Sequence, residues 1–292
     1  MLRLLTAELF KLYKNKTFKV LFIVSIFLGI FTMIMTSSVM EKILESSMQG
    51  MSQEETSQIM EQLSSSNEGQ IITPGSMGMQ IVAKDPLNPT TREVFHSAFG
   101  SGLIEVLLGI FIAAFMAKEY SDKTIKNALS YGKKRYEFYI SKFIIMIIGI
   151  AIILLALTVI PTVGNAITNG WGETFKVSQI GDILRTYGAT LITSASVASI
   201  MMIIAILVKS NGGTIGITIG IFTLFPMLIS FLYGKNKVFD TIYELTPFYT
   251  NRVSMSIYAT GEDIVKAVII ALITIIIFLC IGVQVFKKQD IN

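Results

Sequence analysis

The chain has 292 residues, of which 52% are hydrophobic and only 15% are charged, and its formal net charge is +4. A soluble domain of this length would carry charges at about a quarter of its positions, so the composition argues against a soluble globular fold and favours a protein dissolved in a bilayer. A positive balance would also suit nucleic acid, but in a membrane protein it reflects cytoplasmic loops rich in Lys and Arg, and we expect no nucleic-acid partner.

Single copies of two reactive residue types narrow the chemistry. His96 is the only histidine and Cys280 the only cysteine, so an internal disulfide is excluded. A His/Cys metal site and a hydrolase of the Ser-His or Cys-His type are disfavoured, and a lone histidine is better explained as a polar residue where a span begins than as a catalyst. We therefore expect no enzymatic activity, cofactor or metal in the chain itself.

The N-terminal segment, residues 1–17, predicts an amphipathic interface helix. Lys and Arg surround a set of apolar residues that recur at helical spacing, namely Leu2, Leu5, Leu9, Leu12 and Tyr13. Such a helix lies in the inner interface with its apolar face toward lipid and its basic residues toward anionic headgroups. Two roles fit this pattern, a simple membrane anchor or a lever that meets a soluble partner.

Six apolar runs follow that are long enough to span a membrane, which takes about 20 mostly apolar residues. They lie at 18–40, 98–117, 143–165, 186–208, 212–233 and 267–286. A short polar turn at 209–211 makes the fourth and fifth spans, 186–233, a hairpin, and the sixth span and its tail occupy 267–292. The sequence therefore predicts an all-α polytopic membrane protein with six transmembrane helices.

Loop charges predict the orientation of these spans. Lys and Arg gather in 1–17, in 118–142, in the 209–211 turn and in the C-terminal tail, whereas the long 41–97 loop contains eight acidic and three basic residues. Basic loops stay inside, so both termini are expected to be cytoplasmic. The 41–97, 166–185 and 234–266 segments then lie outside, the last as an extracellular or re-entrant element. The 41–97 loop is either a solvated surface loop or an outer lid or substrate gate.

The segment 118–142 is the one sizeable loop predicted on the cytoplasmic side. Glu119 precedes Lys123 by four residues and Asp122 precedes Lys126 by four, and both pairs favour a helix over 118–129 that ends at Gly132. A basic run of this kind commonly sets topology as a solvated face. A short helix between two spans also offers a soluble partner a surface to push.

The residue order in this segment resembles a known family pattern. It runs Glu119-Tyr120-x-x-x-Thr124-Ile125-x-Asn127-x-Leu129-Ser130, then Arg135, then Ser141-Lys142-Phe143. This order is similar to the loop after the second span in permeases of type-2 ATP-binding-cassette (ABC) exporters. Glu119, Thr124 and Lys142 match the recurrent Glu, Thr and Lys of that family, whereas Lys123 stands where a glycine is usual.

Two further stretches share the resemblance. Glu8-Leu9-x-Lys11 is similar to the connecting helix of the family, and Leu245-Thr246-Pro247-Phe248 to the segment before its last span. The resemblance implies a coupling helix, seated in a cleft of a cytoplasmic ABC ATPase subunit. The coupling contact would involve Glu119, Tyr120, Thr124, Ile125 and Asn127.

The chain has no G-x-x-x-x-G-K-[ST] phosphate loop. ATP and magnesium would therefore be bound by the partner ATPase. The resemblance also implies a second permease copy, identical or paralogous, surrounded by the lipid of a bacterial plasma membrane. Apolar, Thr and Ser residues in the second and fifth spans favour a hydrophobic or amphipathic substrate, such as an antimicrobial peptide or a lipid-like molecule, so that the exporter would confer peptide resistance.

Glu105 lies about two turns into the second span from its predicted outer end. A carboxylate at that depth normally faces the protein interior or water, so Glu105 is either a structural acid or a cation contact in the translocation path. A different class of function also fits the sequence, namely a non-transporting membrane sensor or assembly protein whose outer 41–97 loop binds a ligand.

Overall fold

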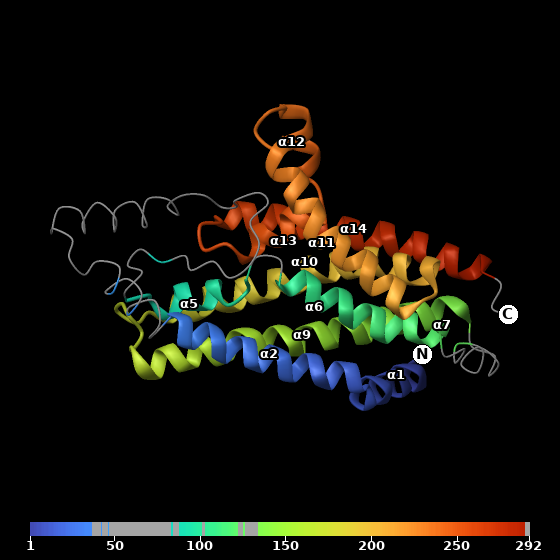
Figure 1. Ribbon diagram of the computed structural model, residues 1–292, viewed down its shortest axis with the longest axis horizontal. Helices are drawn as coiled ribbons and strands as arrows, with labels where there is room; N and C mark the ends of the chain where they lie inside the picture. The colour runs from blue at the N-terminus through green and yellow to red at the C-terminus, as the bar shows by residue number, and fades with distance from the viewer. Residues whose placement is uncertain are drawn as a thin grey trace.

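The computed structural model describes residues 1–36, 42, 46, 83, 88–100, 103–121, 125 and 134–289. Within these ranges the secondary structure is helical. The helices are α1 (Leu2–Lys14), α2 (Lys16–Ile34), α5 (Thr91–Ser97), α6 (Leu103–Ile112), η2 (Ala113–Ala117), α7 (Lys118–Ser121), α9 (Arg135–Thr168), α10 (Val177–Val208), α11 (Asn211–Leu232), α12 (Lys237–Glu244), α13 (Pro247–Met255) and α14 (Gly261–Lys288). The long helices run along one axis, and both termini lie at the same end (Figure 1).

Five of the described helices are long and apolar enough to cross a membrane, as expected of a multi-pass membrane protein. They are α2, α9, α10, α11 and α14. The predicted first, third, fourth, fifth and sixth spans each fall on one of them. The predicted second span corresponds to α6 and η2, which follow each other directly and continue into α7.

The segment η2 is a π-helical stretch, and it sets this region apart from the regular spans. All of its residues, Ala113–Ala117, are buried. A π-helical turn bonds each amide to a carbonyl five residues back, which widens the helix and shifts the carbonyls out of the α-helical ladder. Such turns often mark functional positions, because a carbonyl becomes available to another group.

Three helices extend beyond the predicted spans. α9 begins at Arg135, α10 at Val177 and α14 at Gly261. The added turns contain polar residues but no proline and no two consecutive glycines, which would break a helix. The helical hydrogen bonds therefore continue past the apolar run. The consequence for function is that Lys142, predicted at the end of a loop, lies two turns inside α9.

The core centres on α9. Its buried residues include Phe138, Tyr139, Ile150 and Leu154. α2 packs closely along it at Gly29, where an added Cβ would lie 3.2 Å from the Ala156 carbonyl oxygen. Two helix backbones approach this closely only where one of them has a small residue, and here that residue is Gly29.

Two turns in the chain are specified by local hydrogen bonds. Asn15 separates α1 from α2, and its side chain accepts a hydrogen bond from the Phe18 amide. Lys209 closes α10 in the left-handed region at φ 55°, and the Ser210 hydroxyl then accepts from the Gly213 amide to begin α11. These caps satisfy amides that a helix start leaves unpaired.

The segment between α11 and α14 folds into two short helices. α13 begins with Pro247, and the Thr246 side chain accepts a hydrogen bond from the Tyr249 amide. The Thr-Pro step noted in the sequence is therefore a helix start, where proline loses no hydrogen bond. α12 stands out from the bundle on the side where α14 lies (Figure 1).

Candidate functional site

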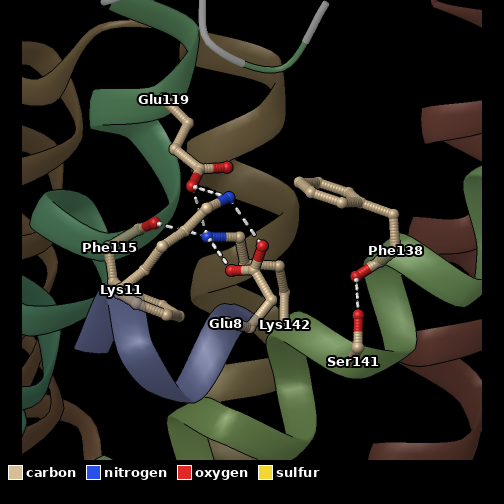
Figure 2. Close-up of polar contacts among 7 residues, drawn as sticks. All are labelled: Glu8, Lys11, Phe115, Glu119, Phe138, Ser141 and Lys142. Carbon is tan, nitrogen blue, oxygen red and sulfur yellow. Dashed lines mark hydrogen bonds and ion pairs between the residues drawn. The ribbon is translucent and has the colours of Figure 1, made fainter. Parts of the chain in front are cut away.

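A cluster of four charged side chains, three of them largely buried, joins α1, α7 and α9. At its centre is Lys142, which is fully buried. The Lys142 Nζ lies 2.6 Å from Glu8 Oε2 and 2.7 Å from Glu119 Oε1. Figure 2 shows the three side chains converging from three separate segments of the chain.

Lys11 completes the cluster and balances its charge. Its Nζ lies 2.6 Å from Glu8 Oε1 and 3.0 Å from Glu119 Oε1. The four side chains, Glu8, Lys11, Glu119 and Lys142, thus hold two positive and two negative charges, and each acid contacts both lysines. Buried charges persist only when they are paired in this way, because an isolated ion in a low-dielectric interior costs several kcal/mol.

The π-helical segment also contacts the cluster. The Phe115 carbonyl oxygen accepts a hydrogen bond from Lys142 Nζ at 3.4 Å, and the Phe115 ring centroid lies 4.0 Å from the same nitrogen. A ring face carries partial negative charge and attracts an ammonium. η2 thus supplies Lys142 with two uncharged partners and places Glu119 at the start of the next turn.

The helical spacing of α1 explains how Glu8 reaches this site. The residues of α1 that are buried recur every four positions: Leu4, Glu8 and Leu12. This stripe faces the bundle, whereas Leu2 and Tyr13 are 81% and 67% exposed. Because Glu8 lies between two buried leucines, its carboxylate is inside the protein, and only a partner with positive charge makes that position stable.

Lys11 is the most exposed member, and its protonation reflects the balance between burial and charge. Burial alone lowers the pKa of Lys11, but the carboxylates of Glu119 and Glu8 outweigh that effect, and the pKa is raised. Lys11 is therefore protonated at neutral pH.

Tyr120 links the same region to the C-terminal end of α14. Its hydroxyl donates to Gln289 Oε1 at 3.0 Å, and Gln289 Nε2 donates to the Ile206 carbonyl at 2.7 Å. Arg135 donates to the carbonyls of Lys287 and Gln289 at 2.9 and 2.7 Å. Burial raises the pKa of Tyr120, so its hydroxyl remains a donor. α7, α9, α10 and α14 are thereby joined at the end of the bundle where both termini lie.

The predicted coupling residues fall into two groups. Glu119 and Tyr120 lie in α7 with the contacts given above, and Ile125 is 1% exposed. Thr124 and Asn127 lie outside the described residues. The sequence resemblance selected Glu8, Lys11, Glu119 and Lys142 from separate motifs, and the structure brings these four into one cluster.

Glu105, the predicted acid within a span, is 3% exposed and sits in a second polar region. Its Oε1 accepts a hydrogen bond from Asn251 Nδ2 at 3.4 Å, and its Oε2 is buried with no hydrogen-bond partner among the described residues. Glu105 and Arg252 both line a cavity of about 10 Å³, which is the space one water occupies. Buried Arg252 Nη1 likewise has no acceptor in the described part of the chain.

Sequence reasoning missed the hydroxyl groups that support Asn251. The Thr193 and Ser194 hydroxyls donate to Asn251 Oδ1 at 2.9 and 3.1 Å, and the hydroxyls of Thr193 and Ser254 lie 2.8 Å apart. The run of Thr and Ser in the middle of α10 could have indicated a buried polar network, because buried hydroxyls need hydrogen-bond partners. Nothing in the sequence identifies Asn251 as that partner.

His96 lies near this polar region, at the end of α5. Its Nδ1 lies 2.8 Å from the Met255 carbonyl oxygen, so a neutral ring that carries its proton on Nδ1 donates to α13. Burial lowers the pKa of His96 to about 4. The ring is therefore uncharged at neutral pH and joins two helices, which fits the predicted polar residue beside a span.

Comparison with known proteins gives a family but no activity. A family model described as "Protein of unknown function (DUF2705)" matches residues 93–292. Because the match covers more than half of the chain, the chain belongs to this family. The matched part contains Glu119 and Lys142, whereas Glu8 and Lys11 precede it. No curated protein matches the chain.

Proposed function

We propose that this member of the DUF2705 family is the permease subunit of an ABC exporter, driven by a separate cytoplasmic ATPase. The observation that carries the proposal is the charged cluster of Glu8, Lys11, Glu119 and Lys142. It ties the N-terminal helix and the segment after the predicted second span to the base of α9. The same four residues lie in two of the stretches that resemble type-2 ABC exporter permeases.

The cluster gives a physical route for force. A push on the segment that begins with α7 acts on Glu119, which is bonded to Lys142 on α9 and to Lys11 on α1. Because α9 is the central helix of the bundle and α2 packs along it, a shift of α9 moves the neighbouring spans together. Packed elements of this kind switch between discrete arrangements instead of deforming gradually.

The full topology belongs to the same proposal. We infer that α6 and η2 form a sixth span, shorter and wider than the other five, and that both termini are cytoplasmic. α1 would then lie in the inner interface, with Leu2 and Tyr13 toward lipid and its Leu4, Glu8 and Leu12 stripe toward the bundle. The exposed apolar residues of α11, from Leu224 to Leu232, leave a face for lipid or a second permease copy.

Glu105 is proposed to act in the translocation path for an amphipathic substrate. Support comes from its burial, from its open oxygen and from the cavity that it shares with Arg252 and several aromatic side chains. A cationic group on a passing substrate would find a carboxylate there, and apolar parts would find Phe222, Phe225 and Phe248.

The test is co-purification of the chain with the ATPase encoded beside it, followed by ATPase assays in proteoliposomes. We expect a stable complex whose turnover falls at least severalfold in Glu119→Ala and Thr124→Ala. Lys134→Ala is the matched control, because Lys134 is exposed and lies outside the cluster. Absence of any bound ATPase, or wild-type turnover in both variants, would overturn the proposal. Melting curves of each variant separate lost coupling from lost folding.

A further inference from the structure

A groove of about 490 Å³ opens on the surface where the end of α12 meets the first turns of α14. Six of its lining residues carry the argument: Leu245, Glu262, Val265, Lys266, Ile269 and Ile270. Four of them are aliphatic, and Leu245, Val265 and Ile269 are each more than half exposed. The groove is therefore an open apolar surface groove whose lining includes one acidic and one basic side chain.

The two charges in the groove are available to a ligand. Glu262 and Lys266 are four residues apart on α14, a spacing at which such a pair often bonds. In the described part of the chain, however, neither makes a salt bridge, and both are exposed. Neighbouring acids are engaged elsewhere: Asp263 accepts from Thr260, and Glu244 accepts from the Tyr233 hydroxyl.

The position of the groove relates it to a bilayer. α14 is one of the five helices able to cross a membrane, and the groove covers only its first three turns. Below the groove the same helix exposes Leu272, Ile273 and Ile276. Charged residues at the end of a span and aliphatic residues along it match the depth profile of a phospholipid, headgroup above and acyl chain below. Leu245, the residue directly after α12, completes the lining, and α12 stands out from the bundle beside α14 (Figure 1).

We propose that this groove binds one phospholipid with a zwitterionic, primary-amine headgroup. The acyl chain lies along Val265 and Ile269, the phosphate contacts Lys266, and the ammonium contacts Glu262. A primary ammonium offers three N–H donors to the carboxylate, which the quaternary ammonium of a choline headgroup lacks. An anionic glycerol headgroup would satisfy Lys266 but leave Glu262 facing negative charge. The site goes beyond the proposed function, because lipid binding here requires no ATPase.

The experiment is native mass spectrometry of the chain, released from nanodiscs that contain equal parts of phosphatidylethanolamine, phosphatidylcholine and phosphatidylglycerol with identical acyl chains. We expect one retained lipid per chain, with phosphatidylethanolamine preferred. In Glu262→Gln its advantage over phosphatidylcholine falls about two- to fivefold, and in Lys266→Gln retention of both zwitterionic lipids falls by a similar factor, as for loss of one exposed charged contact. Lys237→Gln is the matched control, an exposed lysine on α12 that does not line the groove.

A second pair of variants tests the acyl part. Ile269→Trp fills the groove and should lower retention of all three lipids, whereas Ile276→Trp, on the same helix and 64% exposed, should not. Equal retention of the three lipids by the native chain, or equal effects of the two tryptophans, would overturn the proposal. Because Glu262 and Lys266 are exposed and unpaired in the described chain, their substitution leaves the fold intact, and an unchanged lipid profile counts against the site.

Discussion

The protein buries polar side chains in two regions that are stabilised in different ways. Near the termini, Glu8, Lys11, Glu119 and Lys142 form a charged cluster that balances itself. Toward the other end, a hydrogen-bonded group of Thr193, Ser194, Asn251 and Ser254 is neutral and contacts the single acid Glu105. A charged cluster holds distant segments together strongly but is left with an unbalanced buried charge when one member is lost, whereas a neutral network that loses one hydroxyl loses only hydrogen bonds.

The largest predicted effect is at the centre of the charged cluster. Lys142→Met leaves Glu8 and Glu119 with Lys11 as their remaining shared cation, so two acids face one base and the cluster carries an unbalanced charge. We expect the free energy of unfolding to fall by about 3–5 kcal/mol, as when one partner of a buried ion pair is removed. Thermal unfolding in detergent micelles measures the loss.

Two companion variants make that result specific. Lys134→Met removes an exposed lysine at the start of the same helix and should leave the unfolding temperature unchanged. Glu8→Gln combined with Lys142→Met restores charge balance and should recover part of the loss. A melting curve of Lys142→Met that overlays the native one would show that the cluster does not hold α1 and α7 to α9.

The next prediction concerns His96, beside the neutral region, which gains a positive charge when it is protonated at low pH. His96 has a pKa of about 4 in the folded protein, against 6.5 for an unperturbed ring, because burial disfavours the charged form. Between these values the unfolded chain binds a proton that the folded chain does not, so stability is present above pH 6.5 and is lost as the pH falls toward 4. The loss should reach roughly 2 kcal/mol by pH 5. Unfolding temperatures at pH 7 and pH 5 measure it.

His96→Gln isolates this contribution, because a glutamine amide can donate to the Met255 carbonyl but does not titrate in this range. The variant should lose less stability than the native chain between pH 7 and pH 5. An equal loss in both proteins would assign the acid sensitivity to other groups.

The sequence predicted some features of this fold and not others, depending on whether the feature leaves a pattern along the chain. Apolar runs located the five helices that are long and apolar enough to cross a membrane, because a bilayer requires long uninterrupted apolar helices and such runs are visible in the sequence. The π-helical segment inside the predicted second span was not predicted, since its alanines suit an α-helix equally well. α9 and α10 begin at Arg135 and Val177, ahead of the predicted spans at 143 and 186, because hydropathy marks the membrane and not the helix.

The sites follow the same division. Glu8, Lys11, Glu119 and Lys142 were singled out by resemblance to a family motif, but their mutual contacts depend on how α1 folds back onto α9. The predicted lipid face of α1 was partly right: Leu2, Leu9 and Tyr13 are exposed, while Leu12 is buried. Periodicity alone did not reveal the Leu4, Glu8 and Leu12 stripe, because a charge in its middle hides it. Asn251 lies in a short helix that no pattern connects with Thr193 on α10.

The third prediction is a gain of stability at Glu105, in contrast to the loss expected at Lys142. Glu105 is a buried carboxylate with one partner at 3.4 Å and one oxygen that has none among the described residues. Glu105→Gln keeps an acceptor for Asn251 and removes a buried charge, so stability should rise by about 1 kcal/mol. Melting curves measured beside those of Lys142→Met give the contrast. A loss as large as that of Lys142→Met would mean that Glu105 and Arg252 act as a stabilising pair.

The smallest expected effect tests the tolerance of the neutral network. Ser194→Ala removes one of two hydroxyls that donate to Asn251 Oδ1, and Thr193 remains bonded to the same oxygen. No buried donor or acceptor is left without a partner, so the cost should be that of one neutral hydrogen bond, about 1 kcal/mol. Thr193→Val should cost more, because Thr193 also lies 2.8 Å from the Ser254 hydroxyl. Equal costs, each as large as that of Lys142→Met, would mean that the neutral region is as sensitive to a single loss as the charged one.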